Sequence, residues 1–133
     1  IKPNIHELER LLGEPLQHGE NLDLAKIAAA GRTLLEGGIE IVVISLGSEG
    51  ALFINDEQSL FAPGIPVEVK STVGAGDAMV AALALSVQRR DPLPAMVVTA
   101  VGAGTAAVAT EGTAVPNAEI LEHFTSLVTF KTV

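Results

Sequence analysis

The sequence predicts an α/β fold in a single domain. Hydrophobic residues make up 48% of the 133 residues and aromatic residues only 3%, so we expect closely packed helices and strands. The segment 39–45 is rich in β-branched residues and lacks alternation, which is typical of a central strand covered on both faces. Helical periodicity appears on both sides of it. Shorter strand-like runs downstream predict a small antiparallel edge.

Each element is delimited by its periodicity and by turn residues. Apolar residues at i, i+3 and i+4 predict helices over 4–12, 23–36, 75–89, 93–109 and from about 117. Short apolar, β-branched runs predict strands over 39–45, 51–55, 59–62 and 67–69. Gly13, Gly37 and Gly38 end the first two helices. The uncharged stretch 92–110 contains Gly and Thr, so a buried helix is favoured over a membrane span.

Charge and composition argue against several classes of function. The formal net charge is −8, from 8 Lys and Arg against 16 Asp and Glu, whereas nucleic-acid binding normally needs a clustered basic surface. The absence of Cys excludes disulfides and thiolate metal sites and permits a cytoplasmic setting. The three His residues are scattered and are interpreted as surface or helix-face residues. The chain begins with Ile1 and shows no signal peptide, so we interpret it as a fragment.

The segment 71–79, Ser-Thr-Val-Gly-Ala-Gly-Asp-Ala-Met, is the strongest candidate for chemistry. Its glycines let the backbone approach a ligand closely, and the helix that follows offers unpaired N–H groups and the positive end of its macrodipole. Asp77 lies beside this anion site, where it could accept the proton of an attacking hydroxyl during phosphoryl transfer. The alternative is that Asp77 only places a favourable charge at a helix N-terminus.

Asn4 and Glu7 lie three residues apart at the start of the first predicted helix. On one helix face, an amide and a carboxylate could steer a Mg²⁺ ion that keeps several of its waters. The same spacing predicts a capping box, in which both side chains bond to backbone N–H groups, and the two roles are compatible. Lys2 is interpreted either as a ligand of a phosphate or ribose or as a surface lysine.

A glycine-containing turn, Ser-Leu-Gly-Ser-Glu-Gly over 45–50, follows the strand predicted over 39–45. Open α/β sheets bind ligands beyond the carboxyl ends of their parallel strands. Ser45, Gly47 and Gly50 are therefore candidates for ligand contacts. A plain tight turn is the alternative.

These motifs follow the order of one enzyme family. Segment 71–77 resembles the C-terminal signature of the PfkB, or ribokinase-like, carbohydrate kinases, whose usual pattern opens with Asp-Thr where this chain has Ser71-Thr72. That variant is similar to the phosphofructokinase and tagatose-6-phosphate kinase branch. Segments 2–7, 43–51 and 102–113 resemble three further family elements. The resemblance spans essentially the whole chain and implies the C-terminal part of a ribokinase-like fold, a largely parallel sheet flanked by helices with a small antiparallel edge.

The resemblance implies a role for each candidate residue. Asp77 is the catalytic base, and the amides of Gly74, Ala75 and Gly76 form the anion hole for the transferred phosphoryl group. Nucleotide contacts are implied for Lys2, Asn4, Ser45, Gly47, Gly50, Thr72 and Thr105. Mg²⁺ is held through water by Asn4 and Glu7. A monovalent cation such as K⁺ is held by Ser71, Val73, Thr110 and Gly112.

The resemblance further implies an ATP-dependent kinase of a ketohexose phosphate, such as fructose 1-phosphate, fructose 6-phosphate or tagatose 6-phosphate. The residues of the motifs are most similar to those of bacterial 1-phosphofructokinases. A ribose or nucleoside kinase, or a noncatalytic nucleotide-binding domain on the same fold, is the alternative. The N-terminal half of the fold would lie upstream of Ile1, so residues 1–133 form one partial domain that we expect to be inactive alone. The parent enzyme is expected to be a cytoplasmic homodimer that binds neither nucleic acid nor membrane.

Two other nucleotide-binding motifs fit the sequence less well. Gly102-x-Gly104-x-x-Ala107 formally matches a dinucleotide-binding fingerprint if 96–101 is a strand, with Glu122 about twenty residues on. The helix predicted from about 117 argues against this reading, because the acidic residue of that fingerprint should end a strand. A Walker-type ATPase is disfavoured because no Gly-x-x-x-x-Gly-Lys-Ser/Thr occurs.

Overall fold

The computed structural model describes residues 1–16, 22–71, 74–110 and 117–133. They form two compact units, one made of Ile1–Ala62 with Lys131–Val133 and the other of Pro63–Phe130. The sequence predicted a single domain, and the union of the two units in one domain stays a prediction. Within the described ranges, no helix is long and apolar enough to cross a membrane.

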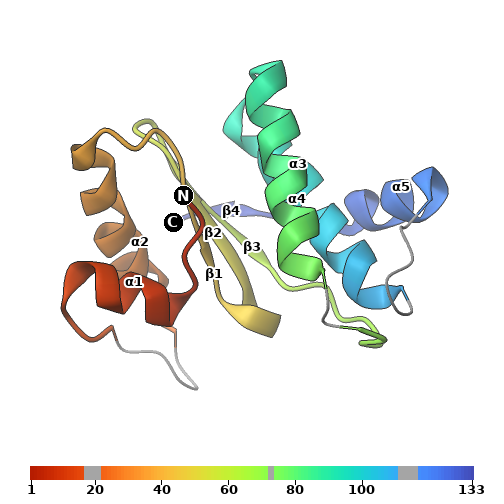
Figure 1. Ribbon diagram of the computed structural model, residues 1–133, viewed down its shortest axis with the longest axis horizontal. Coiled ribbons are helices and arrows are strands. Elements are labelled where there is room, and N and C mark those ends of the chain that lie inside the picture. Colours follow the sequence, from red (N-terminus) through yellow and green to blue (C-terminus); the bar gives the residue numbers. More distant parts are fainter. Residues whose placement is uncertain (17–21, 72–73, 111–116) are drawn as a thin grey trace. The chain divides into compact units, whose positions relative to one another are not determined.

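The first unit is built around a four-stranded sheet with the strand order β1-β2-β3-β4 (Figure 1). Its strands are β1 (Val42–Ser45), β2 (Gly50–Ile54), β3 (Ser59–Pro63) and β4 (Lys131–Thr132). β1 pairs antiparallel with β2, with Val43 opposite Phe53. β3 pairs antiparallel with β4, with Phe61 opposite Lys131. The short turn 55–58 joins β2 to β3, so the sheet grows by successive neighbouring strands.

Two helices pack on this sheet and close the core of the first unit (Figure 1). α1 (Ile5–Leu12) contacts β1, and α2 (Leu24–Thr33), which continues as the 3₁₀ turn η1 (Leu34–Gly37), contacts β1 and β2. Gly31 lets α2 approach the strands closely, because an added Cβ would lie 2.6 Å from Ile54 Cδ1. The core consists of the buried side chains of Ile5, Leu8, Leu16, Ile27, Ala28, Ala30, Val42, Ile44, Leu46, Leu52, Ile54 and Phe61.

The second unit is helical. Its helices are α3 (Ala75–Arg89), α4 (Leu93–Ala109) and α5 (Ala118–Leu127). α4 is central, because it contacts both α3 and α5 and carries most of the buried residues. Its glycines set the helix spacing. A Cβ on Gly102 would lie 3.0 Å from Thr125 Cα in α5, and a Cβ on Gly104 would lie 3.4 Å from the Met79 methyl carbon in α3.

Most of the predicted elements are confirmed. The helices predicted over 75–89 and 93–109 match α3 and α4, whereas the second predicted helix ends as the 3₁₀ turn η1. The strand predicted over 67–69 is wrong, because this segment has no strand partner. The amides that follow it, those of Lys70 and Ser71, instead donate to the Val108 carbonyl in α4 at 3.0 and 3.2 Å. β4 was not predicted.

The α/β class and the antiparallel edge are confirmed, but the strand pairing differs from the largely parallel sheet that was expected. β1, β2 and β3 follow one another through connections too short for a parallel crossover. The parallel pairing recorded in the described residues is a bridge between Asn4 and Ser45. It joins the segment before α1 to the free edge of β1.

Candidate active site

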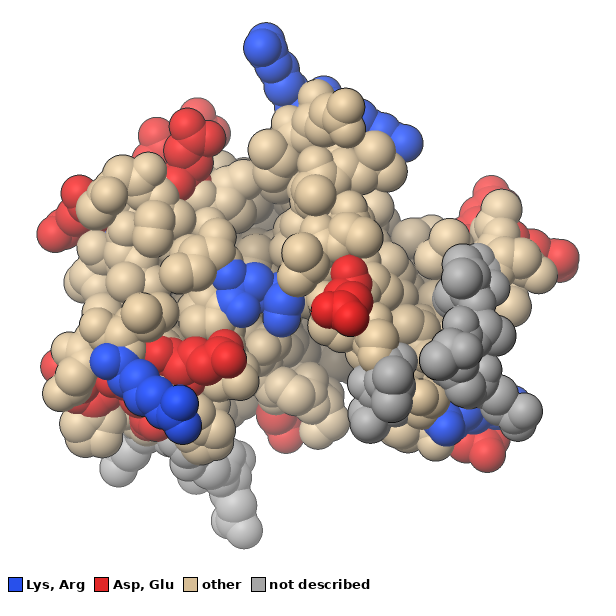
Figure 2. Space-filling model, in the orientation of Figure 1, with Lys and Arg blue, Asp and Glu red and all other residues tan. Residues whose placement is uncertain are grey.

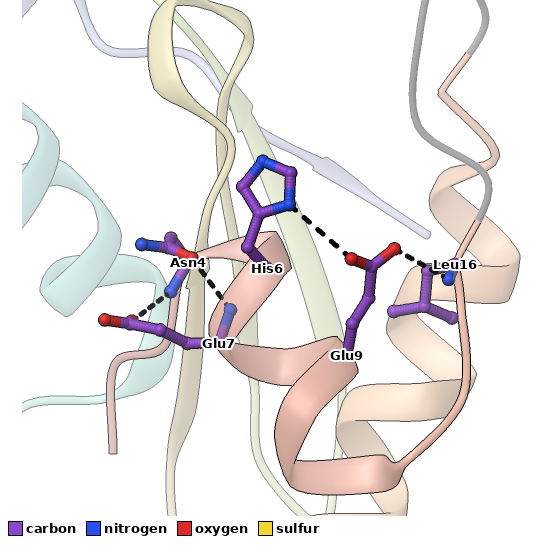
Figure 3. A network of polar contacts seen from close by, with 5 residues as sticks. All are labelled: Asn4, His6, Glu7, Glu9 and Leu16. Atoms are coloured by element: carbon purple, nitrogen blue, oxygen red, sulfur yellow. Dashed lines mark hydrogen bonds and ion pairs between the residues drawn. The ribbon is translucent and has the colours of Figure 1, made fainter.

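The start of α1 is closed by a capping box (Figure 3). Asn4 Oδ1 accepts a hydrogen bond from the Glu7 N–H at 2.9 Å, and Glu7 Oε2 accepts one from the Asn4 N–H at 2.8 Å. A separate pair lies further along the helix, where Glu9 contacts His6 at 3.5 Å and accepts from the Leu16 N–H. The cap predicted from the sequence is therefore confirmed. The role of Asn4 and Glu7 toward Mg²⁺ stays a prediction.

The residues before α1 run parallel to β1. The Val43 N–H donates to the Ile1 carbonyl at 2.9 Å, and the Ser45 N–H donates to the Pro3 carbonyl at 3.1 Å. Asn4 is bridged to Ser45, the last residue of β1. Two predicted motifs that lie forty residues apart in the sequence are thus side by side at one end of the sheet. Lys2, in the same segment, is half-buried.

The turn after β1 is held by two glycines. It passes through the 3₁₀ turn η2 (Gly47–Glu49) before β2 begins at Gly50. Gly47 has a φ of 61° and Gly50 a φ of 122°, a region that favours glycine. Among the described residues, a Cβ on Gly47 would meet nothing within 4 Å. The tight turn is confirmed and explains both glycines, while a nucleotide contact at the exposed Gly47 stays a prediction.

The start of α3 differs from the starts of the other helices. Asn4, Asp23 and Asn117 cap α1, α2 and α5, each accepting a hydrogen bond from the amide three residues on. α4 has no side-chain cap, but Pro in its first turn removes one of the N–H groups that need a partner. α3 has Gly74 as its N-cap, with a φ of 84° and no side-chain hydrogen bond. Among the α-helices of the described residues, α3 is therefore the one for which neither device is seen.

An open first turn leaves donors for an anion. The Ala78 N–H donates to the Gly74 carbonyl at 2.8 Å, so the amides of Ala75, Gly76 and Asp77 precede the first bond within the helix. Gly74, Gly76 and Asp77 are exposed. Such amides, at the positive end of a helix macrodipole, form an anion-binding site when a negatively charged group approaches. Asp77 is at the edge of this turn, where it could serve either as a base or as a helix-end charge.

The carboxyl end of α4 gathers a second set of predicted residues. Through its bond to Val108, Ser71 is held at this helix end, and Thr110 is the C-cap residue of the helix. The Thr110 hydroxyl donates to the Ala106 carbonyl at 2.7 Å. Carbonyls at a helix C-terminus carry partial negative charge, which favours a cation. Ser71 and Thr110 thus lie at one end of α4, and their role toward a monovalent cation stays a prediction.

The middle of α4 excludes the dinucleotide-binding alternative. Residues 93–109 form one continuous helix, so no strand precedes Gly102 and Gly104. Both glycines are explained by packing against neighbouring helices. Thr105, which was predicted to contact a nucleotide, is half-buried, and its hydroxyl donates to the Val101 carbonyl at 2.7 Å.

The predicted site residues fall into two groups, one in each unit. The first unit holds Lys2, Asn4, Glu7, Ser45, Gly47 and Gly50. The second unit holds Ser71, Gly74, Ala75, Gly76, Asp77, Thr105 and Thr110. Thr72, Val73 and Gly112 lie outside the described residues. Sequence reasoning missed the Val108 carbonyl, because nothing in the local pattern shows that a backbone group in α4 receives the amides of a distant loop.

The distribution of charged side chains bears on how phosphates and metal ions could be bound. On the face drawn in Figure 2, Lys and Arg lie in small separate groups. In the part of the chain that the structure describes, no three His, Cys, Asp or Glu side chains gather as a possible metal site. The anion contacts considered at α3 are the backbone amides of its first turn. A Mg²⁺ ion steered by Glu7 would have to keep most of its waters or bind nucleotide phosphates.

Solved structures of sugar kinases are similar to this one. Phosphofructokinase-2 from Escherichia coli in complex with substrates and products gives a TM-score of 0.84 at 32% identity, covering 95% of this chain and 39% of that one. The same enzyme in complex with potassium gives 0.83 at 32% identity, covering 95% and 40%. Ribokinase from Thermotoga maritima gives 0.76 at 26% identity, covering 94% and 41%. The fold is therefore of the ribokinase-like class.

Sequence comparison narrows this class. Residues 1–120 match the pfkB family carbohydrate kinases, and the chain belongs to this family. A 1-phosphofructokinase from Xanthomonas campestris is 50% identical over 84 residues, 63% of this chain and 25% of the relative. The ATP-dependent 6-phosphofructokinase isozyme 2 from Mycobacterium tuberculosis is 36% identical over 127 residues, 96% of this chain and 36% of the relative. The chain thus spans well under half the length of the relatives that it matches.

Proposed function

We propose that this chain is the nucleotide-binding and phosphoryl-transfer part of a kinase that moves the γ-phosphoryl group of ATP to a hydroxyl of a ketohexose phosphate. The observation that carries the proposal is the open first turn of α3 in a pfkB family chain, with Gly74 as the N-cap and Asp77 exposed beside it. Amides aimed at a transferring phosphoryl group stabilise the charge on its equatorial oxygens.

The proposed reaction uses Asp77 as the base. The acceptor hydroxyl oxygen forms a bond to the γ-phosphorus while the bond from that phosphorus to the bridging oxygen of ADP breaks, and the hydroxyl proton passes to the Asp77 carboxylate. A carboxylate can serve as this base, because phosphoryl transfer depends mainly on positioning and on electrostatic stabilisation.

The cations are proposed from the chemistry of the residues available. The exposed carboxylate of Glu7 fits a Mg²⁺ held through water, which would neutralise charge on the nucleotide phosphates. Ser71 and Thr110 lie at the end of α4, and we propose their oxygens as ligands of a monovalent cation such as K⁺. The potassium complex of the Escherichia coli enzyme supports this second assignment.

The names of the relatives support a phosphofructokinase-type substrate, so we propose fructose 1-phosphate, fructose 6-phosphate or tagatose 6-phosphate as the acceptor. A ribose or nucleoside kinase is the second candidate, favoured by the likeness to ribokinase. Because the chain spans a limited share of its relatives, we expect it to bind nucleotide more weakly than a full-length relative and to show no turnover when it is alone. The homodimeric state of a longer parent enzyme stays a prediction, as does a cytoplasmic location.

Thermal unfolding of the chain with and without Mg-ATP tests nucleotide binding. A ligand at about a hundred times its dissociation constant stabilises a protein by roughly 2.7 kcal/mol, which is readable as a shift in the midpoint. We expect a Mg²⁺-dependent shift with ATP and none with NADH as the control. A shift with NADH alone would contradict the kinase assignment.

The base assignment is tested by Asp77→Asn in a kinase of full family length that contains this segment. We expect turnover to fall by orders of magnitude while ATP affinity is largely retained. Glu119→Gln is the matched control, since Glu119 is the acidic residue in the first turn of α5. Near-normal turnover of Asp77→Asn would show that Asp77 serves only as a helix-end charge.

A further inference from the structure

α3 and α4 lie side by side in the second unit, and α4 holds the chain on both sides of the open first turn of α3 (Figure 1). Before the turn, the amides of Lys70 and Ser71 donate to the Val108 carbonyl at 3.0 and 3.2 Å. After it begins, Gly104 packs against the first residues of α3. Residues four apart share a face of a helix, so Gly104 and Val108 belong to one face of α4. This face therefore supports the turn from both ends.

Gly104 faces a peptide group of the proposed anion site. A Cβ on this glycine would lie 3.7 Å from the Ala75 carbonyl oxygen and 3.4 Å from the Met79 methyl carbon. The Ala75 carbonyl and the Gly76 N–H belong to one planar peptide group, so a push on the oxygen turns the N–H as well. The Gly76 N–H is among the amides that precede the first bond within the helix. The distance of α4 from this peptide thus sets the direction of one anion-binding donor.

The surroundings of Gly104, which is buried, limit the size of a residue at this position. An alanine Cβ would be at ordinary contact distances from its neighbours. Valine adds two γ carbons about 1.5 Å beyond Cβ, and its χ1 torsion is stiff in a helix, so these carbons do not swing away freely. Accommodating them requires Met79, or the peptide between Ala75 and Gly76, to move. The size limit at Gly104 therefore coincides with a proposed phosphoryl-binding group.

Gly102, two residues earlier in α4, provides an internal comparison. It is also buried, but its nearest neighbours are atoms of Thr125 in α5, including the backbone Cα at 3.0 Å from an added Cβ. Thr125 is not a predicted site residue. Of these two glycines, Gly104 is therefore the one whose neighbours include a candidate for phosphoryl binding, Ala75.

We propose that Gly104 is a positioning residue for phosphoryl binding, because it lets α4 lie close enough to α3 to hold the Gly76 N–H toward the group that is transferred. This inference deepens the proposed kinase function and rests on it. It gives a role to a glycine that the sequence pattern had placed in a dinucleotide-binding fingerprint, which the continuous helix α4 excludes.

The test compares variants of the 133-residue chain in two measurements. One measurement is the thermal unfolding midpoint without ligand. The other is the dissociation constant of Mg-ADP divided by that of Mg-ATP, which isolates the contribution of the γ-phosphoryl group because ADP lacks it. Gly104→Ala, Gly104→Ser and Gly104→Val form a series of increasing size. Gly102→Ala is the matched control, since it disturbs α4 at its contact with α5.

We expect Gly104→Ala to keep the wild-type ratio, because its Cβ fits. Gly104→Val should lower the ratio about tenfold or more, the usual cost of losing one hydrogen bond to a charged group, and Gly104→Ser should fall between the two. Gly102→Ala should lower the midpoint and keep the ratio. A ratio that follows the size of residue 104 and not the midpoint is a result that a purely structural glycine would not give.

Two results would overturn the positioning role while leaving the kinase proposal intact. One is an unchanged ratio in the largest Gly104 variant that folds, including the case in which ATP and ADP lose affinity equally. The other is an equal fall of the ratio in Gly102→Ala, which would mean that the ratio follows stability and not the place of the substitution. A wild-type chain that binds ATP no more tightly than ADP would instead refute the proposed phosphoryl site at α3, and the inference with it.

Discussion

The two glycines of α4 should respond in opposite ways to alanine. Gly→Ala in a helix interior normally stabilises by about 1 kcal/mol, because alanine has the higher helix propensity. At Gly104 the added Cβ would lie 3.4 Å from the Met79 methyl carbon and 3.7 Å from the Ala75 carbonyl oxygen, which are ordinary contact distances. We therefore expect Gly104→Ala to raise the free energy of unfolding by up to about 1 kcal/mol.

At Gly102 the same change meets the backbone of α5. The added Cβ would lie 2.5 Å from Thr125 Cγ2, 3.0 Å from Thr125 Cα and 3.1 Å from its amide nitrogen. Rotating the side chain would break the bond of its hydroxyl to the Glu122 carbonyl at 2.9 Å and would not move the backbone atoms. Overpacking of this kind costs about 1–3 kcal/mol and loss of the hydroxyl bond about 1 more, against a gain in propensity of about 1.

The net expectation for Gly102→Ala is a free energy of unfolding lower by about 1–3 kcal/mol. Urea denaturation of both variants measures it, provided that the slope with urea is unchanged. Thr125→Ser is the control background, because it removes Cγ2 but leaves Cα and the amide in place, so Gly102→Ala should cost less there without becoming favourable. Equal effects of the two alanine variants, or stabilisation by Gly102→Ala, would refute the packing argument.

Three further substitutions have expected outcomes in the same denaturation assay. Ser86 is buried in α3 with a hydroxyl that has no partner among the described residues, so Ser86→Ala should stabilise by about 1 kcal/mol, and destabilisation would mean that the hydroxyl is satisfied. Arg90 caps the end of α3 at a φ of 58°, so Arg90→Gly should stabilise by about 1 kcal/mol, whereas Arg90→Ala should not. Gly47→Ala should destabilise by about 1–2 kcal/mol through its φ of 61° alone, and a loss of Mg-ATP affinity beyond that of Ser48→Ala would support a nucleotide contact there.

The helices could be predicted from the sequence because the residues that start and end each helix lie next to it in the chain. α3 begins after Gly74 and α4 after Pro92, and both match the predicted ranges. Asn117 accepts from the Ile120 N–H, as expected for the residue that starts the last helix. The second predicted helix failed only in its last turn, where η1 replaces α-helix before Gly38. Helix ends depend on bonds within a few residues, and sequence patterns report those bonds well.

Strand pairing was harder to predict from the sequence, because it depends on partners far away in the chain. β4 has two residues and exists through its pairing with Phe61 and its neighbour in β3. The segment 67–69 has a strand-like composition but no partner strand. The bridge between Asn4 and Ser45 could not be predicted from the sequence either, although each residue was a candidate in its own motif. Local patterns thus supplied the candidate residues, and only non-local pairing showed which of them meet.

The open start of α3 carries the most functional meaning because it departs from the capped starts of α1, α2 and α5. In α1, α2 and α5 an Asn or Asp side chain caps the first turn, and such a cap contributes about 1 kcal/mol to stability. α3 has no such cap, because Gly74 at its N-cap position has no side chain, and Asp77 in the same turn is exposed. Departures from local rules concentrate at functional sites, where a ligand supplies the missing partner. A phosphoryl group bound at α3 would make the bonds that Asn4 makes at α1, so the same helix-end chemistry accounts for a permanent cap in one unit and a proposed transient one in the other.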